Sequence, residues 1–182
     1  GVMQFEHAHG FRPQVAQTLR QVWPEALNEW VRLGAEPVGL GPAADDVVML
    51  SRRITFERAL HQIAADCPDL TLRTGHVEDL MCEMGRTGVV VDGEQVAADL
   101  VVDASGRTGR IGREFGRDEL DVSGDCGLAY VDRAFRLKPG SPLGPMTTPL
   151  GHIAEFDGYQ CLVFLHEHGH FSVVLVRPTA DE

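Results

Sequence analysis

The run Asp99-Leu-Val-Val-Asp-Ala-Ser-Gly-Arg107 constrains the fold of this chain more than any other stretch. Its apolar residues follow an acidic one and lead directly into a turn of small residues that contains Gly106. In open α/β sheets, ligands bind at the carboxyl ends of strands, and a glycine there lets them approach the backbone because it has no Cβ. The run therefore predicts a buried strand over 99–103 that ends in a ligand-binding turn. An ordinary strand followed by a surface turn explains the same residues.

Length and charge narrow the class of protein. The chain has 182 residues, of which 43% are hydrophobic, so it is long enough for one large domain or two small ones with a buried core. Its formal net charge of -11 repels phosphate backbones, which disfavours nucleic acid as a partner. No apolar run approaches the length of a membrane span, and no signal-like segment opens the chain.

The cysteines indicate a reducing compartment. They lie far apart in the sequence and form no CxxC pair, which argues against structural zinc and against a disulfide framework. We therefore expect a cytoplasmic protein. The four are Cys67, Cys82, Cys126 and Cys161.

Helices are expected in the first third of the chain. Pro24 opens a second helix directly after the first, because proline is tolerated at the first helical position, and Gly34 closes it. Ser51 stands at the N-cap of a third helix that ends near Asp66. The expected elements are an irregular segment over 1–12, two helical pieces within 13–33, a loop over 35–46, a strand over 47–50 and a helix over 51–66.

Strands are expected in the remainder. A small meander turns at Gly85 and at Asp92-Gly93. After about residue 122, Pro- and Gly-rich turns separate four strand-like segments without a helix between them, which is typical of an antiparallel sheet. The expected strands cover 70–74, 77–82, 88–91, 95–97, 99–103, 127–137, 146–156, 160–165 and 171–177.

Two familiar motifs have little support from their context. Gly39-Leu-Gly-Pro-Ala-Ala44 matches the GxGxxA spacing of dinucleotide-binding loops, which need a strand before them and a helix after them. Pro42 and the acidic pair that follows favour an ordinary loop. Ser105 has no adjacent histidine and no GxSxG elbow is present, so no nucleophile–base pair is visible.

Histidines cluster in two places. The segment His166-Glu-His-Gly-His170 offers three imidazoles, and alternate strand residues share a face that suits a metal ion. Gly169 and the apolar runs on both sides favour a hairpin turn instead, which scatters side chains, so we expect no metal site. His7 and His9 are interpreted as loop residues, with a role in a site as the alternative.

Arginines gather at two candidate ligand positions. Arginines alternate with glycines after the 99–103 run, an arrangement that holds phosphate or pyrophosphate in other proteins or forms a solvated basic loop. Arg52-Arg53 opens a helix, where the dipole favours anions, and such a misfit is typical of a ligand site or of a surface pair. The alternating arginines are Arg107, Arg110, Arg113 and Arg117.

Together these segments resemble the FAD-dependent oxidoreductases of the para-hydroxybenzoate hydroxylase type. These are group A flavoprotein monooxygenases, with flavin halogenases and geranylgeranyl reductases as relatives. The resemblance rests on Ser51-Arg-Arg-Ile-Thr-Phe-Glu-Arg-Ala-Leu60, Thr74-Gly-His-Val77 and Ala98-Asp-Leu-Val-Val-Asp-Ala-Ser-Gly-Arg107, in this order and spacing. Gln4-Phe-Glu-His-Ala-His9 resembles a segment of some actinobacterial-type members. The similarity covers most of residues 1–137 and continues more loosely to the end.

The resemblance implies cofactor roles for particular residues. Arg53 corresponds to the arginine that reaches FAD, and Val77 to the residue whose backbone meets the adenine. Four residues of the turn, Asp103, Ser105, Gly106 and Arg107, correspond to the family's Asp-Gly turn beside the FAD pyrophosphate and the path of NAD(P)H. Ser105 stands where the family has aspartate, which puts the handling of NAD(P)H in doubt. The antiparallel second half resembles the substrate-binding sheet that covers the flavin.

Two further motifs of that family are missing from the chain. These are the GxGxxG turn that opens the FAD-binding domain and a later Gly-Asp motif at the flavin. We therefore expect an interior fragment of a longer enzyme with an α/β (α+β) fold. A partial FAD-binding α/β domain would cover 1–122, and a partial antiparallel substrate domain 123–182. The isolated chain should bind FAD weakly or not at all, and it should associate with itself through uncovered apolar surface.

The implied activity of the longer parent is flavin-dependent oxidation of a small organic molecule, most simply hydroxylation or epoxidation. In such enzymes the cofactor activates oxygen while the protein positions the substrate and excludes water, so no catalytic triad is expected. The isolated chain should be inactive. Two alternatives stay open: a non-redox binding or interaction module derived from a flavoprotein fold, and a metal-binding β-domain that uses His166–His170.

Overall fold

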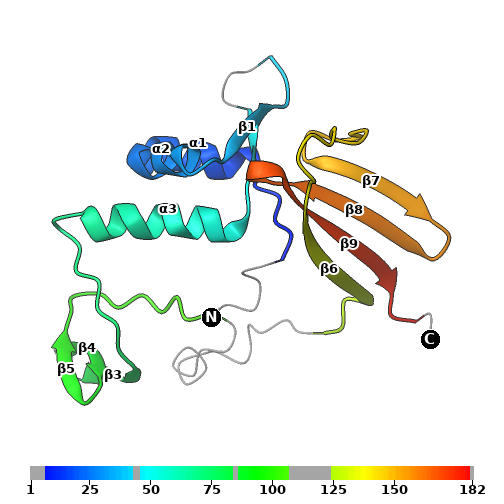
Figure 1. Ribbon diagram of the computed structural model, residues 1–182. Helices are drawn as coiled ribbons and strands as arrows, with labels where there is room; N and C mark the ends of the chain where they lie inside the picture. The colour runs from blue at the N-terminus through cyan, green and yellow to red at the C-terminus, as the bar shows by residue number, and fades with distance from the viewer. Residues whose placement is uncertain (1–6, 43–45, 84–85, 107–123, 181–182) are drawn as a thin grey trace. The chain divides into compact units, whose positions relative to one another are not determined.

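The chain forms two compact units, and the computed structural model describes residues 7–42, 46–83, 86–106 and 124–180 of them. Unit 1 combines Gly1–Thr71 with Asp125–Glu182, and unit 2 is Leu72–Gly124. Unit 1 contains the helices and a four-stranded sheet, and its elements are α1 (Pro13–Val22), α2 (Pro24–Arg32), β1 (Glu36–Gly39), β2 (Val47–Leu50), α3 (Arg53–Asp66), β6 (Leu128–Arg136), β7 (Gly151–Phe156), β8 (Tyr159–Leu165), the 3-10 turn η2 (Glu167–Gly169) and β9 (His170–Pro178) (Figure 1).

The two predicted N-terminal helices are confirmed, with their signals in the expected places. Both α1 and α2 begin with proline at the first helical position. Gly34, with φ of 110°, follows the end of α2, and the Ala35 N–H donates to the Trp30 carbonyl at 3.2 Å. A left-handed glycine just past the last turn is the usual way to close a helix.

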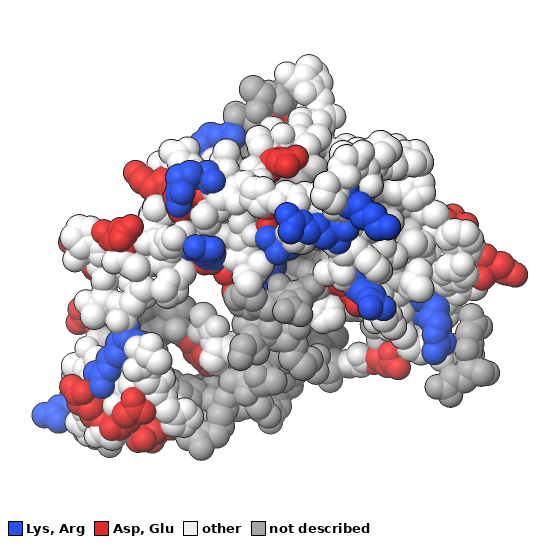
Figure 2. Space-filling model, viewed as in Figure 1, with Lys and Arg blue, Asp and Glu red and all other residues white. Residues whose placement is uncertain are grey.

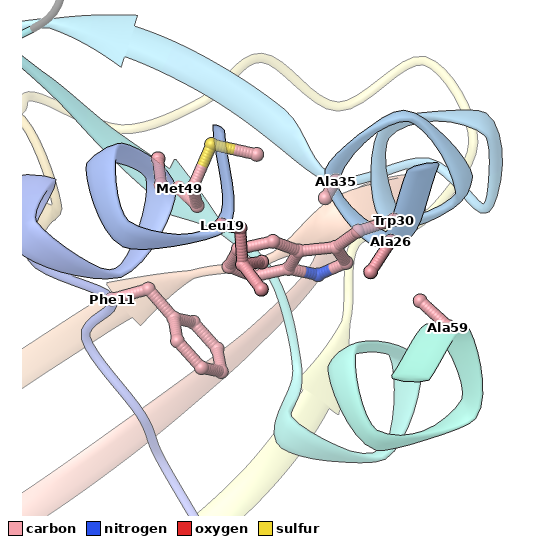
Figure 3. Packing of buried hydrophobic residues seen from close by; sticks show 8 residues of the cluster. Phe11, Leu19, Ala26, Trp30, Ala35, Met49 and Ala59 are labelled. Atoms are coloured by element: carbon pink, nitrogen blue, oxygen red, sulfur yellow. The ribbon is translucent and has the colours of Figure 1, made fainter. Parts of the chain in front are cut away.

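Trp30 lies at the centre of the helical core. Its ring lies 4.8 Å from that of Phe11 and 4.6 Å from that of Phe56, and its side chain is fully buried (Figure 3). The indole Nε1–H donates to Ser51 Oγ at 2.9 Å. The predicted N-cap role of Ser51 is therefore wrong: its oxygen serves the buried indole, and Arg52 occupies the N-cap position.

The predicted loop over 35–46 contains a strand instead. β1 pairs with β2 in antiparallel register, from Glu36 opposite Leu50 to Gly39 opposite Val47. The Leu40 N–H then donates to the Asp46 carbonyl at 2.8 Å. The GxGxxA match therefore begins in a hairpin connection, as its context indicated, although residues 43–45 lie outside the described part of the chain.

The predicted antiparallel sheet of the C-terminal part is confirmed. Its strand order is β6-β9-β8-β7, and every neighbouring pair is antiparallel. β7 begins later than expected, because Thr147 and Thr148 donate their N–H groups to the Gly151 carbonyl. Gly151 is required there, since a Cβ would lie 1.9 Å from the Val163 carbonyl oxygen.

Unit 2 contains a three-stranded antiparallel meander, as predicted. It consists of β3 (Val77–Glu83), β4 (Arg86–Val91) and β5 (Glu94–Ala97), in the order β3-β4-β5. Asp92 and Gly93 connect β4 to β5 with φ of 50° and 79°, the pair of positive values that suits a tight hairpin. The predicted turn at Gly85 lies outside the described residues.

Two predicted strands are wrong. Residues 99–103 and 70–74 have no regular secondary structure and pair with no described strand. Leu100 and Val102 are 77% and 76% exposed, so the run is not buried either. Apolar character alone does not make a strand, because its backbone groups need a partner strand for their hydrogen bonds.

The structure has a mixed α+β fold in which all described strand pairs are antiparallel. The division at residue 122 follows the change from helices to strands, whereas the compact units join the two ends of the chain. That sequence-based division stays a prediction. Among the described residues, no helix is both long and apolar enough to cross a membrane.

Candidate functional site

Arg53, the predicted FAD ligand of unit 1, is the first residue of α3. Its Nε donates to the Glu57 carboxylate, one turn further along the helix. The carboxylate offsets the unfavourable position of a cation at a helix start. The arginine is about one quarter exposed, so its guanidinium reaches the surface of the unit.

The other predicted FAD residues belong to unit 2. Val77 is the first residue of β3 and is 41% exposed. Asp103 Oδ1 accepts a hydrogen bond from the Ser105 N–H at 2.9 Å, which folds the segment into a turn. Gly106 follows with φ of 82°, and among the described residues other than its chain neighbours no atom lies within 4 Å of where its Cβ would be.

The structure thus brings Asp103, Ser105 and Gly106 together in one open turn, although this turn does not follow a strand. Its backbone can be approached closely, which fits a phosphate-bearing ligand. Arg53 belongs to the other unit. Arg107 and the arginines of its glycine-rich continuation lie outside the described residues.

The segment from His166 to His170 is a hairpin turn, as its glycine predicted. Its three imidazoles face different partners: His166 Nε2 lies 3.1 Å from Ser172 Oγ, and His168 Nε2 lies 3.2 Å from the Leu33 carbonyl. The His170 Nδ1 lies 3.1 Å from the Glu167 carbonyl oxygen. Among the described residues, no three metal-ligating side chains converge, so the metal-binding alternative is not supported.

The turn is nevertheless not a solvated tip, because Glu167 is completely buried. Its carboxylate accepts hydrogen bonds from the N–H and the Nε of Arg52, both at 2.7 Å, and from the Thr55 hydroxyl. Burial alone would raise the pKa of Glu167, but the hydrogen bonds from Thr55 and Arg52 outweigh it and hold the pKa below its usual value. This cluster ties the sheet to the start of α3.

His166 is the second buried ionisable group of the turn. It is 6% exposed, and burial lowers its pKa because the imidazolium form would lose its hydration. Burial therefore favours the neutral form of the ring, whose Nε2 lies 3.1 Å from Ser172 Oγ. Both groups are structural parts of the junction between the sheet and the helices.

A pocket of about 470 Å³ lies on one face of the sheet in unit 1. Alternate residues of a strand share a face, and the pocket takes such pairs from β6, β8 and β9. The segment that precedes α1 forms its other wall. The lining residues are His7, Ala8, His9, Tyr130, Asp132, Leu162, Phe164, Val174 and Val176.

Asp132 is the acidic residue of this pocket, and its side chain is only 3% exposed. Its Oδ2 accepts a hydrogen bond from the Ala8 N–H and lies 3.4 Å from His7 Nδ1. Its Oδ1 is buried and has no hydrogen-bond partner among the described residues. Buried polar atoms are nearly always paired, so this oxygen is one of a few exceptions in the described part of the chain, with Gln62 Oε1, His152 Nδ1 and His166 Nδ1.

A second pocket of about 340 Å³ is lined by side chains of the opposite sheet face. Val163, Leu165 and Phe171 contribute to it, together with residues of the segment that precedes β7. Its lining is predominantly apolar and contains no acidic or basic residue apart from His152. Each pocket contains a buried polar atom without a partner, His152 Nδ1 in the second and Asp132 Oδ1 in the first. The first differs in that its polar group is a carboxylate beside apolar walls.

Neither the role of Asp132 nor the burial of Glu167 was predicted from the sequence. The signal for Asp132 is an acidic residue at the middle of a strand, in Leu128-Ala-Tyr-Val-Asp-Arg-Ala-Phe-Arg136. No neighbouring residue indicates the burial of Glu167, since its partners Arg52 and Thr55 precede it by more than one hundred residues. The alternative site role of His7 and His9 gains support, because both line the pocket.

The chain was compared with known proteins. A mutant of PqsL from P. aeruginosa matches with a TM-score of 0.69 at 14% identity, over 95% of this chain and 50% of that one. Peptidyl tryptophan dihydroxylase QhpG, essential for tryptophylquinone cofactor biogenesis, matches with a TM-score of 0.55 at 17% identity, over 96% and 38%. These likenesses show a shared fold, of which this chain spans half the length or less. No family model and no curated protein matches the chain.

Proposed function

We propose that this chain is part of a flavin-dependent monooxygenase of the para-hydroxybenzoate hydroxylase type, whose small organic substrate binds in the pocket beside Asp132. The observation that carries the proposal is this pocket, apolar on its sheet side and with one unsatisfied carboxylate oxygen. The fold shared with QhpG, a dihydroxylase, supports an oxygenation reaction. The substrate domain of the proposal is the sheet β6-β9-β8-β7.

The residues of the pocket would bind and orient the substrate. Leu162, Val174 and Val176 supply an apolar floor that excludes water from the bound molecule. Asp132 accepts a hydrogen bond at one side and so fixes which way the substrate faces. His7 and His9 line the same pocket.

FAD would supply the oxygen chemistry in the longer parent. By the family resemblance, the residues that hold it are Arg53, Val77, Asp103, Ser105, Gly106 and Arg107. The open, left-handed backbone at Gly106 fits the close approach of a pyrophosphate. On the face that Figure 2 shows, basic side chains gather near the meeting of the helices and the sheet of unit 1, which suits an anionic cofactor. NAD(P)H as the reductant is part of the same proposal.

The proposal is tested by cofactor binding in a parent protein that includes the sequences flanking this chain. Arg53→Ala should weaken FAD binding about tenfold or more, because a charge-assisted hydrogen bond contributes on the order of 1.5–3 kcal/mol. Arg58→Ala, an exposed position on the same helix, is the matched control and should leave FAD affinity unchanged. FAD affinity is measured by fluorescence quenching, with folding checked by circular dichroism. An unaltered constant in folded Arg53→Ala removes this residue from the cofactor site.

The isolated chain should retain no stoichiometric FAD, since the pyrophosphate-binding GxGxxG turn of the family is not within it. Absorbance of the purified chain after gel filtration measures this. A yellow protein with one FAD per chain would contradict the expectation. If the parent also lacks FAD while the pocket still binds small molecules, the alternative of a non-redox binding module replaces the monooxygenase.

We also propose that the chain associates with itself and acts in the cytoplasm without nucleic acid. Val131 and Leu175 of the sheet are 72% and 46% exposed, and both lie on the face opposite the Asp132 pocket. Large exposed apolar side chains on one sheet face favour association. Analytical ultracentrifugation across a wide concentration range tests this, and a strictly monomeric species contradicts it.

A further inference from the structure

We propose that the pocket beside Asp132 selects a cationic amine carried on an apolar body, and that the ammonium group pairs with the Asp132 carboxylate. This inference rests on the proposed function, because it names the substrate class of that same pocket. It concerns binding alone and needs no cofactor. The juxtaposition that carries it is a nearly buried carboxylate beside an apolar strip.

The carboxylate is only partly satisfied by the protein. The Ala8 N–H and His7 Nδ1 both face Oδ2, and Oδ1 has no partner among the described residues. The side chain of Asp132 is only 3% exposed, so water does not freely hydrate Oδ1. A buried carboxylate of this kind is stabilised most by a hydrogen-bond donor that also carries positive charge.

Apart from the His7 imidazole, the described residues that line the pocket supply no cationic side chain to Asp132. The nine lining residues include no lysine and no arginine, and His7 is about half exposed at the pocket's edge. Arg133, next to Asp132 in sequence, lies on the opposite face of β6 because strand residues alternate. Charge complementarity therefore favours an ammonium group over a neutral hydroxyl, and disfavours a carboxylate, as the group placed beside Asp132.

The floor determines the body of the ligand. In the sheet register, Asp132 lies opposite Val174, and Val174 lies opposite Leu162, so these three form one row across β6, β9 and β8. Val176 and Phe164 extend the apolar strip by one step on either side. Two such steps along the strands measure about 13 Å, which is long enough for two fused rings.

A matched ligand series tests the charge. The probes are 2-(aminomethyl)naphthalene, 2-naphthalenemethanol and 2-naphthoic acid, which share one body and present an ammonium, a hydroxyl and a carboxylate. Calorimetry on the flavin-free 182-residue chain should give the amine a dissociation constant at least tenfold lower than the alcohol, as expected for one charge-assisted hydrogen bond. The acid should bind more weakly than either. Equal or tighter binding of the alcohol overturns the proposal.

Variants locate the selectivity. Asp132→Asn keeps the shape of the side chain and should abolish the preference for the amine, because the amide has no charge. Asp157→Asn in the exposed turn between β7 and β8 makes the same chemical change elsewhere and should preserve the preference. Val176→Phe should weaken all three probes alike, since it fills the strip. If Val176→Phe affects none of them, the probes bind elsewhere and the proposal fails.

The two proposals fail in different ways. The calorimetry is done without flavin. If the unaltered chain shows no preference for the amine, the proposed substrate class is wrong, but flavin binding by the parent is not affected by that result. A parent without FAD rejects the monooxygenase and leaves the measured amine preference standing.

Discussion

Two buried carboxylates of unit 1 are surrounded very differently. Glu167 is completely buried, and both of its oxygens accept hydrogen bonds, from Arg52 and Thr55. Asp132 is almost as buried, yet one of its oxygens has no partner among the described residues. A satisfied buried carboxylate contributes to stability, whereas an unsatisfied one lowers stability and is suited to binding. The comparison separates a structural junction from a site.

The largest expected effect is the loss of the Glu167 cluster. Glu167→Ala leaves the Arg52 guanidinium and the Thr55 hydroxyl without their acceptor and should lower the free energy of unfolding by about 3 kcal/mol. Chemical denaturation of both proteins measures this. Glu155→Ala, in an exposed position of the same sheet, serves as the control with a change near zero. A difference below about 1 kcal/mol would mean that the hydrogen bonds of Glu167 do not contribute substantially to stability.

The other anchor of the turn is its contact with the end of α2. Gly34→Ala places a Cβ 2.4 Å from His168 Nε2 and forces an alanine to adopt φ of 110°. We expect a loss of about 2 kcal/mol in stability, because strain and displacement of His168 add to each other. Gly140→Ala, with φ of 77° and open space around it, isolates the backbone strain and should cost about 1 kcal/mol. Equal losses in the two variants would show that the His168 contact does not matter.

The pH dependence of stability tests the buried junction that contains His166 and Glu167. Because the folded-state pKa of His166 lies below its ordinary value of 6.5, the unfolded chain takes up a proton first as the pH falls. Stability should therefore be full above pH 6.5 and fall below it by at most about 1.4 kcal/mol per pH unit. His166→Gln should remove this slope while keeping a polar group near Ser172. The folded-state pKa of Glu167 is likewise lowered from 4.5, so its contribution is lost only at more acidic pH.

The smallest effect on stability is expected at the site. Asp132→Asn keeps the hydrogen bond from the Ala8 N–H and removes an incompletely satisfied charge, so stability should change by less than about 1 kcal/mol. Thermal and chemical unfolding measure it, alongside the ligand series above. A loss of stability as large as that of Glu167→Ala would show that Asp132 is a structural residue, and the distinction between the two carboxylates would be wrong.

Local sequence signals predicted the helices and hairpins well. Proline at the start of α1 and α2, Gly34 after α2 and Asp92-Gly93 between β4 and β5 act through the backbone geometry of their own residues. Such signals need no knowledge of the rest of the chain. The antiparallel sheet was also predictable, because its strands follow one another with short turns between β7, β8 and β9.

The errors arose where distant residues decide the structure. The apolar run over 99–103 has the composition of a strand, but no described strand pairs with it. Ser51 has the composition of a cap, but the indole of Trp30 takes its oxygen. The site was hidden for the same reason, since Asp132 meets Ala8 across 124 residues of sequence. A short window of sequence does not contain both residues of such a pair.

The bond between Arg52 and Glu167 spans 115 residues, and the whole of unit 2 is inserted between the two halves of unit 1. During synthesis, at roughly 5–20 residues per second, Glu167 therefore follows Arg52 by roughly 6–23 seconds. Throughout that interval the helical half lacks the complete sheet of unit 1, because unit 2 is synthesised between the helices and the sheet. Chain connectivity thus places the contact between Arg52 and Glu167 after the synthesis of the helices and of the inserted meander.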